Sequence, residues 1–195
     1  MIAMKEKTMT TVYFDYSCDY TNRFQRFLQM ADVAADFRPF SLAVTDDNNG
    51  GSGVWDRKVR DLPVSVQALV GHEIVRAGGG EGIVTFQKEM FALFGDEGRE
   101  PDATAAWKLV EKFTGVPRDQ LDETAALSLV RRSHESAVMT GVFGTPTVFA
   151  SDSDRPMFVK MEVIPHDGPA AKRLWRKLPS ALPRFPEAVV IEADE

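Results

Sequence analysis

The sequence predicts an α/β fold in which a long helical segment interrupts the sheet. A run of β-branched and aromatic residues at Thr10–Asp15 is followed by a polar turn and by apolar residues spaced three and four apart. Helical spacing then dominates residues 46–140, and strand-like runs return at Pro146–Ala150 and Met157–Val163. These periodicities predict, in order, a strand–helix–strand unit, a helical insertion, a β-hairpin and a last helix.

The strand–helix–strand unit begins with TTVYFD at Thr10–Asp15, whose residue types are enriched in strands. From Asp19 or Tyr20 to about Ala35, apolar residues form the stripe of an amphipathic helix. The segment Ala35–Val44 is predicted to be a second strand. A helical crossover between neighbouring strands favours their parallel pairing.

The insertion opens with the loop-forming sequence DDNNGGSG at Asp46–Gly53. Four segments within it combine helical spacing with good helix formers: Trp55–Arg76, Ile83–Phe94, Asp102–Thr114 and Asp119–Met139. We therefore expect residues 8–45 and 141–195 to form one domain, and residues 46–140 to form a helical insertion domain.

Strand-like sequence follows the insertion. Turn residues between Pro146–Ala150 and Met157–Val163 predict a hairpin. A helix is expected at Gly168–Leu178, and the proline-rich segment after it is expected to pack over the surface in extended form.

Composition argues against two classes of partner. With 195 residues, 44% of them hydrophobic, the chain can bury a core. Its net charge of −6 argues against a nucleic-acid binder, which usually has a basic face. No apolar run approaches the roughly 20 residues of a spanning helix, and Met1–Thr10 lacks the apolar stretch of a signal peptide. We expect a cytoplasmic protein that binds neither nucleic acid nor membranes.

The chain has one cysteine, Cys18, which excludes a disulfide within the chain. The histidines His72, His134 and His166 lie far apart in the sequence, with no cysteine pair near them. No metal site is therefore expected.

Two segments carry a family resemblance: FDYSCDYT at Phe14–Thr21 and GVFGTPT at Gly141–Thr147. They resemble the active-site turn and the cis-proline loop of the DsbA-like proteins, which have a thioredoxin-like fold with a large all-helical insertion. The resemblance implies that Cys18 is the first cysteine of a Cys-x-x-Cys turn, with Thr21 in place of the second. It also implies that the Thr145–Pro146 peptide bond is cis.

Within that family the chain looks most similar to a cytoplasmic branch. This branch includes mycothiol-dependent nitroreductase-type proteins, FrnE-like proteins, 2-hydroxychromene-2-carboxylate isomerases and kappa-class glutathione transferases. The likeness extends to FRPFSLAV at Phe37–Val44, VRRSHES at Val130–Ser136 and the closing run KRLWRKLPSALPRFPE at Lys172–Glu187. It implies a low-molecular-weight thiol, mycothiol or glutathione, as cofactor.

A thiol in the first turn of a helix meets unpaired backbone N–H groups and the positive end of the helix dipole. Both favour the thiolate and can lower the pKa of Cys18 below its free value of about 8.5. Thr21 lies one turn further on and can donate a hydrogen bond to the sulfur, but it cannot resolve a mixed disulfide. The carboxylate of Asp19 opposes thiolate formation, although an acidic residue there also suits the helix dipole.

Cys18 and Thr21 are thus the predicted catalytic residues. Five neighbours are predicted to bind substrate: Tyr16, Asp19, Tyr20, Thr145 and Pro146. The two tyrosines can cover a ligand with amphipathic rings or simply close the edge of the core. The backbone before the proline faces the thiol in the resembling proteins and can pair with an extended substrate.

Three functional hypotheses stay open. The first is a thiol-dependent oxidoreductase or transferase that uses Cys18 as its single nucleophile, with a low-molecular-weight thiol as cosubstrate and a small-molecule or thiol/disulfide substrate. The second is an isomerase or glutathione-transferase-like enzyme in which Cys18 positions the bound thiol. The third is a non-catalytic binding protein with a lapsed site. For each, the chain is a monomer or a homodimer.

Overall fold

The computed structural model describes residues 9–45, 52–79, 82–95, 100–150, 156–181 and 189–191. Its centre is a mixed five-stranded sheet in the order β2-β1-β3-β4-β5. The strands are β1 (Thr10–Phe14), β2 (Ala35–Pro39), β3 (Thr147–Phe149), β4 (Met157–Met161) and β5 (Val189–Ile191). Both β1–β2 and β4–β5 are parallel pairs, whereas β1–β3 and β3–β4 are antiparallel.

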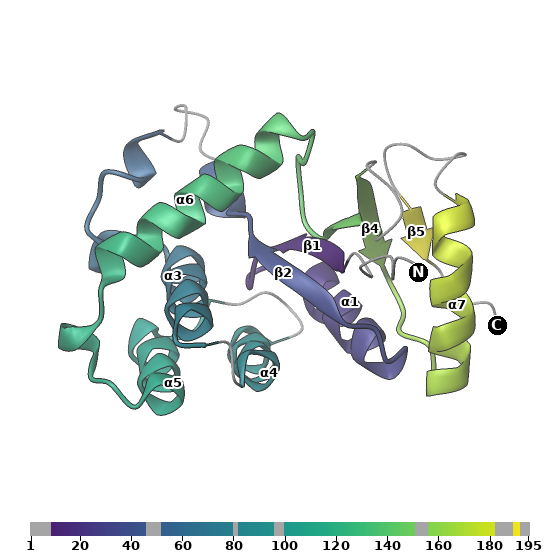
Figure 1. Ribbon diagram of the computed structural model, residues 1–195, viewed down its shortest axis with the longest axis horizontal. Helices are drawn as coiled ribbons and strands as arrows, with labels where there is room; N and C mark the ends of the chain where they lie inside the picture. Colours follow the sequence, from purple (N-terminus) through teal and green to yellow (C-terminus); the bar gives the residue numbers. More distant parts are fainter. Residues whose placement is uncertain are drawn as a thin grey trace, which may run out of the picture.

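The predicted strand–helix–strand unit and hairpin are present. Helix α1 (Asp19–Met30) connects β1 to β2 and buries Phe24, Phe27 and Leu28 along one stripe. Strand β5 was not predicted, because the sequence indicated only an extended segment after the last helix. That helix is α7 (Gly168–Ala181), which packs beside α1 at the opposite end of the molecule from the helical segment (Figure 1).

The second strand is shorter than the sequence predicted. It ends at Pro39, and Leu42–Thr45 form a short helix, α2, instead of continuing the strand. The pairing stops there because β1 itself ends at Phe14, whose carbonyl still accepts a hydrogen bond from the Phe40 N–H at 2.8 Å. Ser41 then favours the helix, because its hydroxyl accepts a hydrogen bond from the Val44 N–H at 3.3 Å.

The helical segment contains α3 (Val64–Ala77), α4 (Ile83–Phe94), α5 (Ala103–Thr114) and α6 (Glu123–Met139), with 3-10 turns η1 (Ser52–Val54), η2 (Val59–Asp61) and η3 (Arg118–Gln120). Two helices begin later than predicted. Pro63 is the N-cap of α3, and proline disfavours helical backbone angles at the residue before it, so Leu62 is extended and the helix starts after the proline. Asp122 starts α6 because its carboxylate accepts a hydrogen bond from the Ala125 N–H at 2.9 Å.

A large cluster of buried apolar side chains extends from the sheet into these helices. Its centre is aromatic: the Phe14 ring at the end of β1 lies 5.0 Å from that of Tyr16 and 6.1 Å from that of Phe91 on α4. The division into a domain of residues 8–45 and 141–195 and an insertion of residues 46–140 stays a prediction, and positions 8, 46 and 195 lie outside the described residues.

Within the described part of the chain, no helix combines the length and apolar character needed to cross a membrane.

Because α3 packs closely on α5, replacing Gly71 with alanine is expected to destabilise the protein. An added Cβ would meet Val110 Cγ2 at 2.5 Å, so Gly71→Ala is expected to lower the free energy of unfolding by about 1–3 kcal/mol. Without that clash, alanine would raise it by about 1 kcal/mol through helix propensity. Urea denaturation measures whether the substitution lowers or raises the free energy of unfolding. Gly53→Ala is the control, because its Cβ would meet nothing within 4 Å, and equal effects at the two glycines would contradict the packing argument.

Candidate functional site

Cys18 is the N-cap residue of α1, with extended backbone angles, and its carbonyl accepts the first intrahelical bond from the Asn22 N–H at 3.1 Å. Its thiol donates a hydrogen bond to the carbonyl oxygen of Thr145, with Sγ and O separated by 3.2 Å. The Thr145–Pro146 peptide bond is cis. Two segments separated by 127 positions in the chain therefore meet at this contact.

Strand pairing brings these segments together. Because β1 and β3 are antiparallel, with Tyr13 opposite Thr147, the turn that follows β1 lies beside the loop that precedes β3. Two hydrogen bonds fix that loop: Thr147 Oγ1 donates to the Gly144 carbonyl at 2.7 Å, and the Val159 N–H donates to the Pro146 carbonyl at 3.0 Å. The sheet therefore determines what the thiol faces.

Asp15 stabilises the turn between β1 and α1 by hydrogen bonds. It was not among the predicted site residues. Its Oδ1 accepts hydrogen bonds from the N–H and hydroxyl of Ser17 at 2.9 and 2.8 Å, and its Oδ2 accepts one from the Leu42 N–H at 2.8 Å. Burial nevertheless raises the pKa of this carboxyl. The signal in the sequence was an aspartate that directly follows an apolar strand.

The pKa of the Cys18 thiol is raised, although a helix terminus by itself can lower it. Burial is the largest cause, since the residue is only 7% exposed. The side chain of Thr145 and both the side chain and backbone of Thr21 lower the pKa, while the negative charge of Asp15 raises it. The helix terminus does favour the thiolate, but removal from water outweighs it.

The threonine hydroxyls beside the sulfur lack acceptors. Thr21 Oγ1 and Thr145 Oγ1 are both buried, and neither has a hydrogen-bonding partner within the described ranges. Both side chains are close enough to the sulfur to favour its charged form, although the geometry of a formed hydrogen bond is not reached. Deprotonation of Cys18 would give these two donors an acceptor.

Asp19 faces the first turn of α1 and not the thiol. Its Oδ1 accepts from the Tyr20 N–H at 2.9 Å, and its Oδ2 forms an ion pair with Arg23 at 3.0 Å. The carboxylate whose charge opposes the thiolate is that of Asp15. Tyr20 lies at the surface, where its hydroxyl donates to Glu162 Oε1 at 3.1 Å.

Tyr16 points inward and is 1% exposed. Its hydroxyl lies 3.0 Å from His72 Nδ1, and its ring centroid lies 4.7 Å from that of Phe91. His72 was not predicted to lie near this turn, because a contact across 56 positions leaves no trace in sequence spacing. The role of Tyr16 in covering a ligand stays a prediction.

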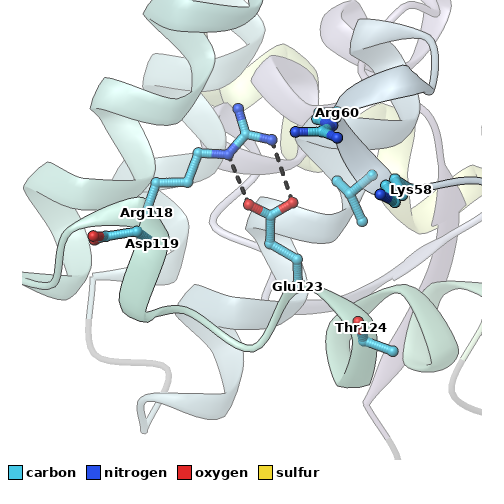
Figure 2. Close-up of a pocket in the computed structure, with 7 residues that line it drawn as sticks. Lys58, Arg60, Arg118, Asp119, Glu123 and Thr124 are labelled. Atoms are coloured by element: carbon cyan, nitrogen blue, oxygen red, sulfur yellow. Dashed lines mark hydrogen bonds and ion pairs between the residues drawn. The ribbon is translucent and has the colours of Figure 1, made fainter.

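A separate cavity of about 550 Å³ lies among η2, η3 and α6 (Figure 2). Arg118 spans it with a bidentate ion pair to Glu123, at 2.7 and 3.2 Å, and the guanidinium also stacks 3.9 Å above the Trp107 ring. Figure 2 shows Lys58 and Arg60 across from this pair. Cys18 does not line this cavity. Across the described residues, no three His, Cys, Asp or Glu side chains cluster closely enough to hold a metal ion.

Comparison with solved structures identifies the fold. A 2-hydroxychromene-2-carboxylate isomerase structure matches 91% of this chain and 95% of its own, at a TM-score of 0.55 and 20% identity. Mtb DsbA in the oxidized form matches 76% of each chain, at a TM-score of 0.50 and 17% identity. No protein-family model and no curated protein matches the sequence. The chain has a thioredoxin-like fold with a large helical insertion.

Thr21→Val should have two measurable effects, one on the free energy of unfolding and one on the pKa of Cys18. Replacing a buried, unpartnered hydroxyl with a methyl group is expected to raise the free energy of unfolding by about 1 kcal/mol. Loss of that donor should also raise the pKa of Cys18. Urea unfolding and the pH dependence of Cys18 alkylation measure the two effects. Thr124→Val, at an exposed position on α6, should change neither, and an unchanged or lowered thiol pKa in Thr21→Val would refute the assigned donor.

Burial lowers the pKa of His72 to about 3. The unfolded chain takes up this proton near pH 6.5, but the folded protein does not. The contribution of His72 to stability is therefore complete above pH 6.5 and decreases as the pH falls toward 3. Between pH 7 and 5 the wild type should lose about 2 kcal/mol more than His72→Gln. His166→Gln, at an exposed histidine, should keep the wild-type slope, and parallel slopes for wild type and His72→Gln would contradict this prediction.

Proposed function

On the basis of the thioredoxin-like fold, we propose that this chain is a thiol-dependent oxidoreductase or transferase in which Cys18 is the single reactive thiol. The observation that carries the proposal is the position of the Cys18 sulfur, at the start of α1 and 3.2 Å from the carbonyl oxygen of Thr145. The unpartnered hydroxyls of Thr21 and Thr145 support it, because they would stabilise a thiolate at that place.

The proposed reaction is thiol–disulfide exchange. The Cys18 thiolate attacks one sulfur of a disulfide, forms a mixed disulfide and releases the other sulfur as a thiolate. Thr21 has no sulfur with which to resolve this intermediate. A low-molecular-weight thiol, glutathione or mycothiol, therefore attacks the mixed disulfide. It forms a new disulfide with the bound group and restores the Cys18 thiolate.

The substrate is a small molecule or a thiol/disulfide compound, and the proposed setting is the cytoplasm, where such thiols are kept reduced. Asp19 and Tyr20 lie on the first turn of α1 and are candidates for contact with the departing group. Thr145 and Pro146 would border the entering group, since the thiol faces their loop.

A second candidate function is favoured by the raised pKa of the thiol. A neutral Cys18 is a hydrogen-bond donor, as its contact with Thr145 illustrates. In that role it would donate to the sulfur of a bound thiol cofactor and position it without forming a covalent bond. An isomerase is among the similar structures, so an isomerase or transferase of this type is the alternative proposal.

Two substitutions distinguish these mechanisms. Intact-mass measurement after incubation with glutathione disulfide should detect one glutathionyl group on the wild type, but none on Cys18→Ser or Cys18→Ala. If Cys18 is instead a donor, no adduct forms. Reduced glutathione should then bind Cys18→Ser with nearly wild-type affinity, because serine also donates, and bind Cys18→Ala about tenfold or more weakly, the loss expected for a charged hydrogen bond.

Glutathione and mycothiol, with their disulfides, should be tested in parallel, because the geometry does not distinguish these two thiols. A wild-type protein that forms no adduct with either disulfide and binds neither reduced thiol would contradict both mechanisms. That result would leave the non-catalytic binding protein as the surviving hypothesis.

A further inference from the structure

We propose that an aromatic pair, Phe143 and Phe158, selects the substrate of the Cys18 site by binding an apolar end of the group that the thiol accepts. This inference rests on the proposed thiol–disulfide exchange and names the class of compound that undergoes it. The preferred substrate is a disulfide, or a similar sulfur electrophile, whose transferred group ends in an aromatic ring or another apolar group.

Phe143 presents an exposed ring directly before the cis-proline loop. It is 59% exposed, and in the described ranges it is the only aromatic side chain among the large hydrophobic residues that are exposed. The chain reaches this position as it passes from the end of α6 to the sheet beside β4 (Figure 1). An exposed phenyl ring gains free energy when an apolar group covers it.

Phe158 supports the ring of Phe143 from β4. The two ring centroids lie 5.0 Å apart, at an interplanar angle of 57°. Side chains alternate along β4, so Phe158 points away from the side of the buried Met157 and Val159. Its Cε2 atom lies 3.1 Å from the position that a Cβ on Gly144 would take. The backbone of the loop therefore rests directly against the aromatic pair.

The aromatic pair lies within reach of a group bound to the thiol. Gly144 directly precedes Thr145, whose carbonyl oxygen is 3.2 Å from the Cys18 sulfur. Because consecutive Cα atoms are about 3.8 Å apart, the Phe158 ring lies roughly 10 Å from that sulfur. A phenylpropyl group has a similar reach. Its ring can therefore contact the aromatic pair while its sulfur is bonded to Cys18.

Phe143 carries most of the free apolar surface of the aromatic pair. A charged group, Lys160, lies beside Phe158, with Nζ 5.8 Å from the ring centroid. A cation over a ring covers part of it. Phe143 has no such contact within the part of the chain that the structure describes. It is therefore the residue to change.

The test compares two methanethiosulfonates, 3-phenylpropyl and propyl, which modify thiols by the same reaction. The thiolate attacks the sulfenyl sulfur, an S–S bond to the transferred group forms, and methanesulfinate leaves with the electron pair of the broken bond. Intact-mass measurements give the rate constants for Cys18, which are divided by those for N-acetylcysteine. After this correction the wild type should react at least about fivefold faster with the phenylpropyl reagent, because only its ring covers the aromatic pair.

Phe143→Ser should reduce this preference to about one, whereas Phe143→Tyr, which keeps a ring, should retain it. The ratio of the two rates cancels any change in the pKa of the thiol or in access to the sulfur, so a merely structural effect would not alter it. Val84→Ser is the matched control. Val84 is also 59% exposed, but it lies in the first turn of α4, and its substitution should leave the preference unchanged.

The outcomes distinguish this proposal from the proposed function. Equal corrected rates on the wild type would overturn the role of the aromatic pair even if Phe143→Ser fails to fold, and a glutathionyl adduct would then leave thiol–disulfide exchange standing. A phenylpropyl preference without glutathionylation supports the aromatic pair and contradicts glutathione disulfide as the substrate. If neither reagent modifies Cys18, both proposals fail, because exchange requires a reactive thiol.

A second copy of the chain is the competing occupant of this surface, since Val138 and Met139 at the end of α6 are exposed as well. Size-exclusion chromatography with light scattering tests this alternative. The proposal requires that Phe143→Ser leave the molar mass unchanged. A wild-type dimer that this variant dissociates would overturn it.

Discussion

The buried carboxylate of Asp15 is the interaction on which the arrangement of the thiol site depends. One oxygen binds Ser17 in the turn before α1, and the other binds the Leu42 N–H at the start of α2. The carboxylate therefore connects the segments that follow two parallel strands and fixes the position from which Cys18 enters the helix. Because this group is fully buried, its charge also acts on the nearby sulfur with little screening.

The thiol is consequently subject to opposing effects. Donors from Thr145 and Thr21 favour the thiolate, whereas burial and the Asp15 charge favour the protonated form, which donates to the Thr145 carbonyl. Burial is the largest effect, and it distinguishes this site from an exposed helix terminus, where the dipole alone would lower the pKa. Under the two proposed mechanisms, this balance decides whether Cys18 attacks a sulfur atom or only positions one.

The helical segment shares its core with the sheet. Phe14, at the end of β1, and Tyr16, in the turn after it, pack in an aromatic cluster with His72 on α3 and Phe91 on α4. The helical segment therefore supports the turn that presents Cys18.

The sequence by itself determined the elements whose signals are local. Periodicity placed α4 at Ile83–Phe94 and the strands β1, β3 and β4 with small errors at their ends, and the motif around Cys18 and Pro146 indicated the thioredoxin-like fold. It could not end β2 at Pro39, predict β5, or identify His72 as a partner of Tyr16. Strand ends, buried pairs and the pKa of the thiol depend on contacts between distant segments and on removal from water, so only the tertiary structure decided them.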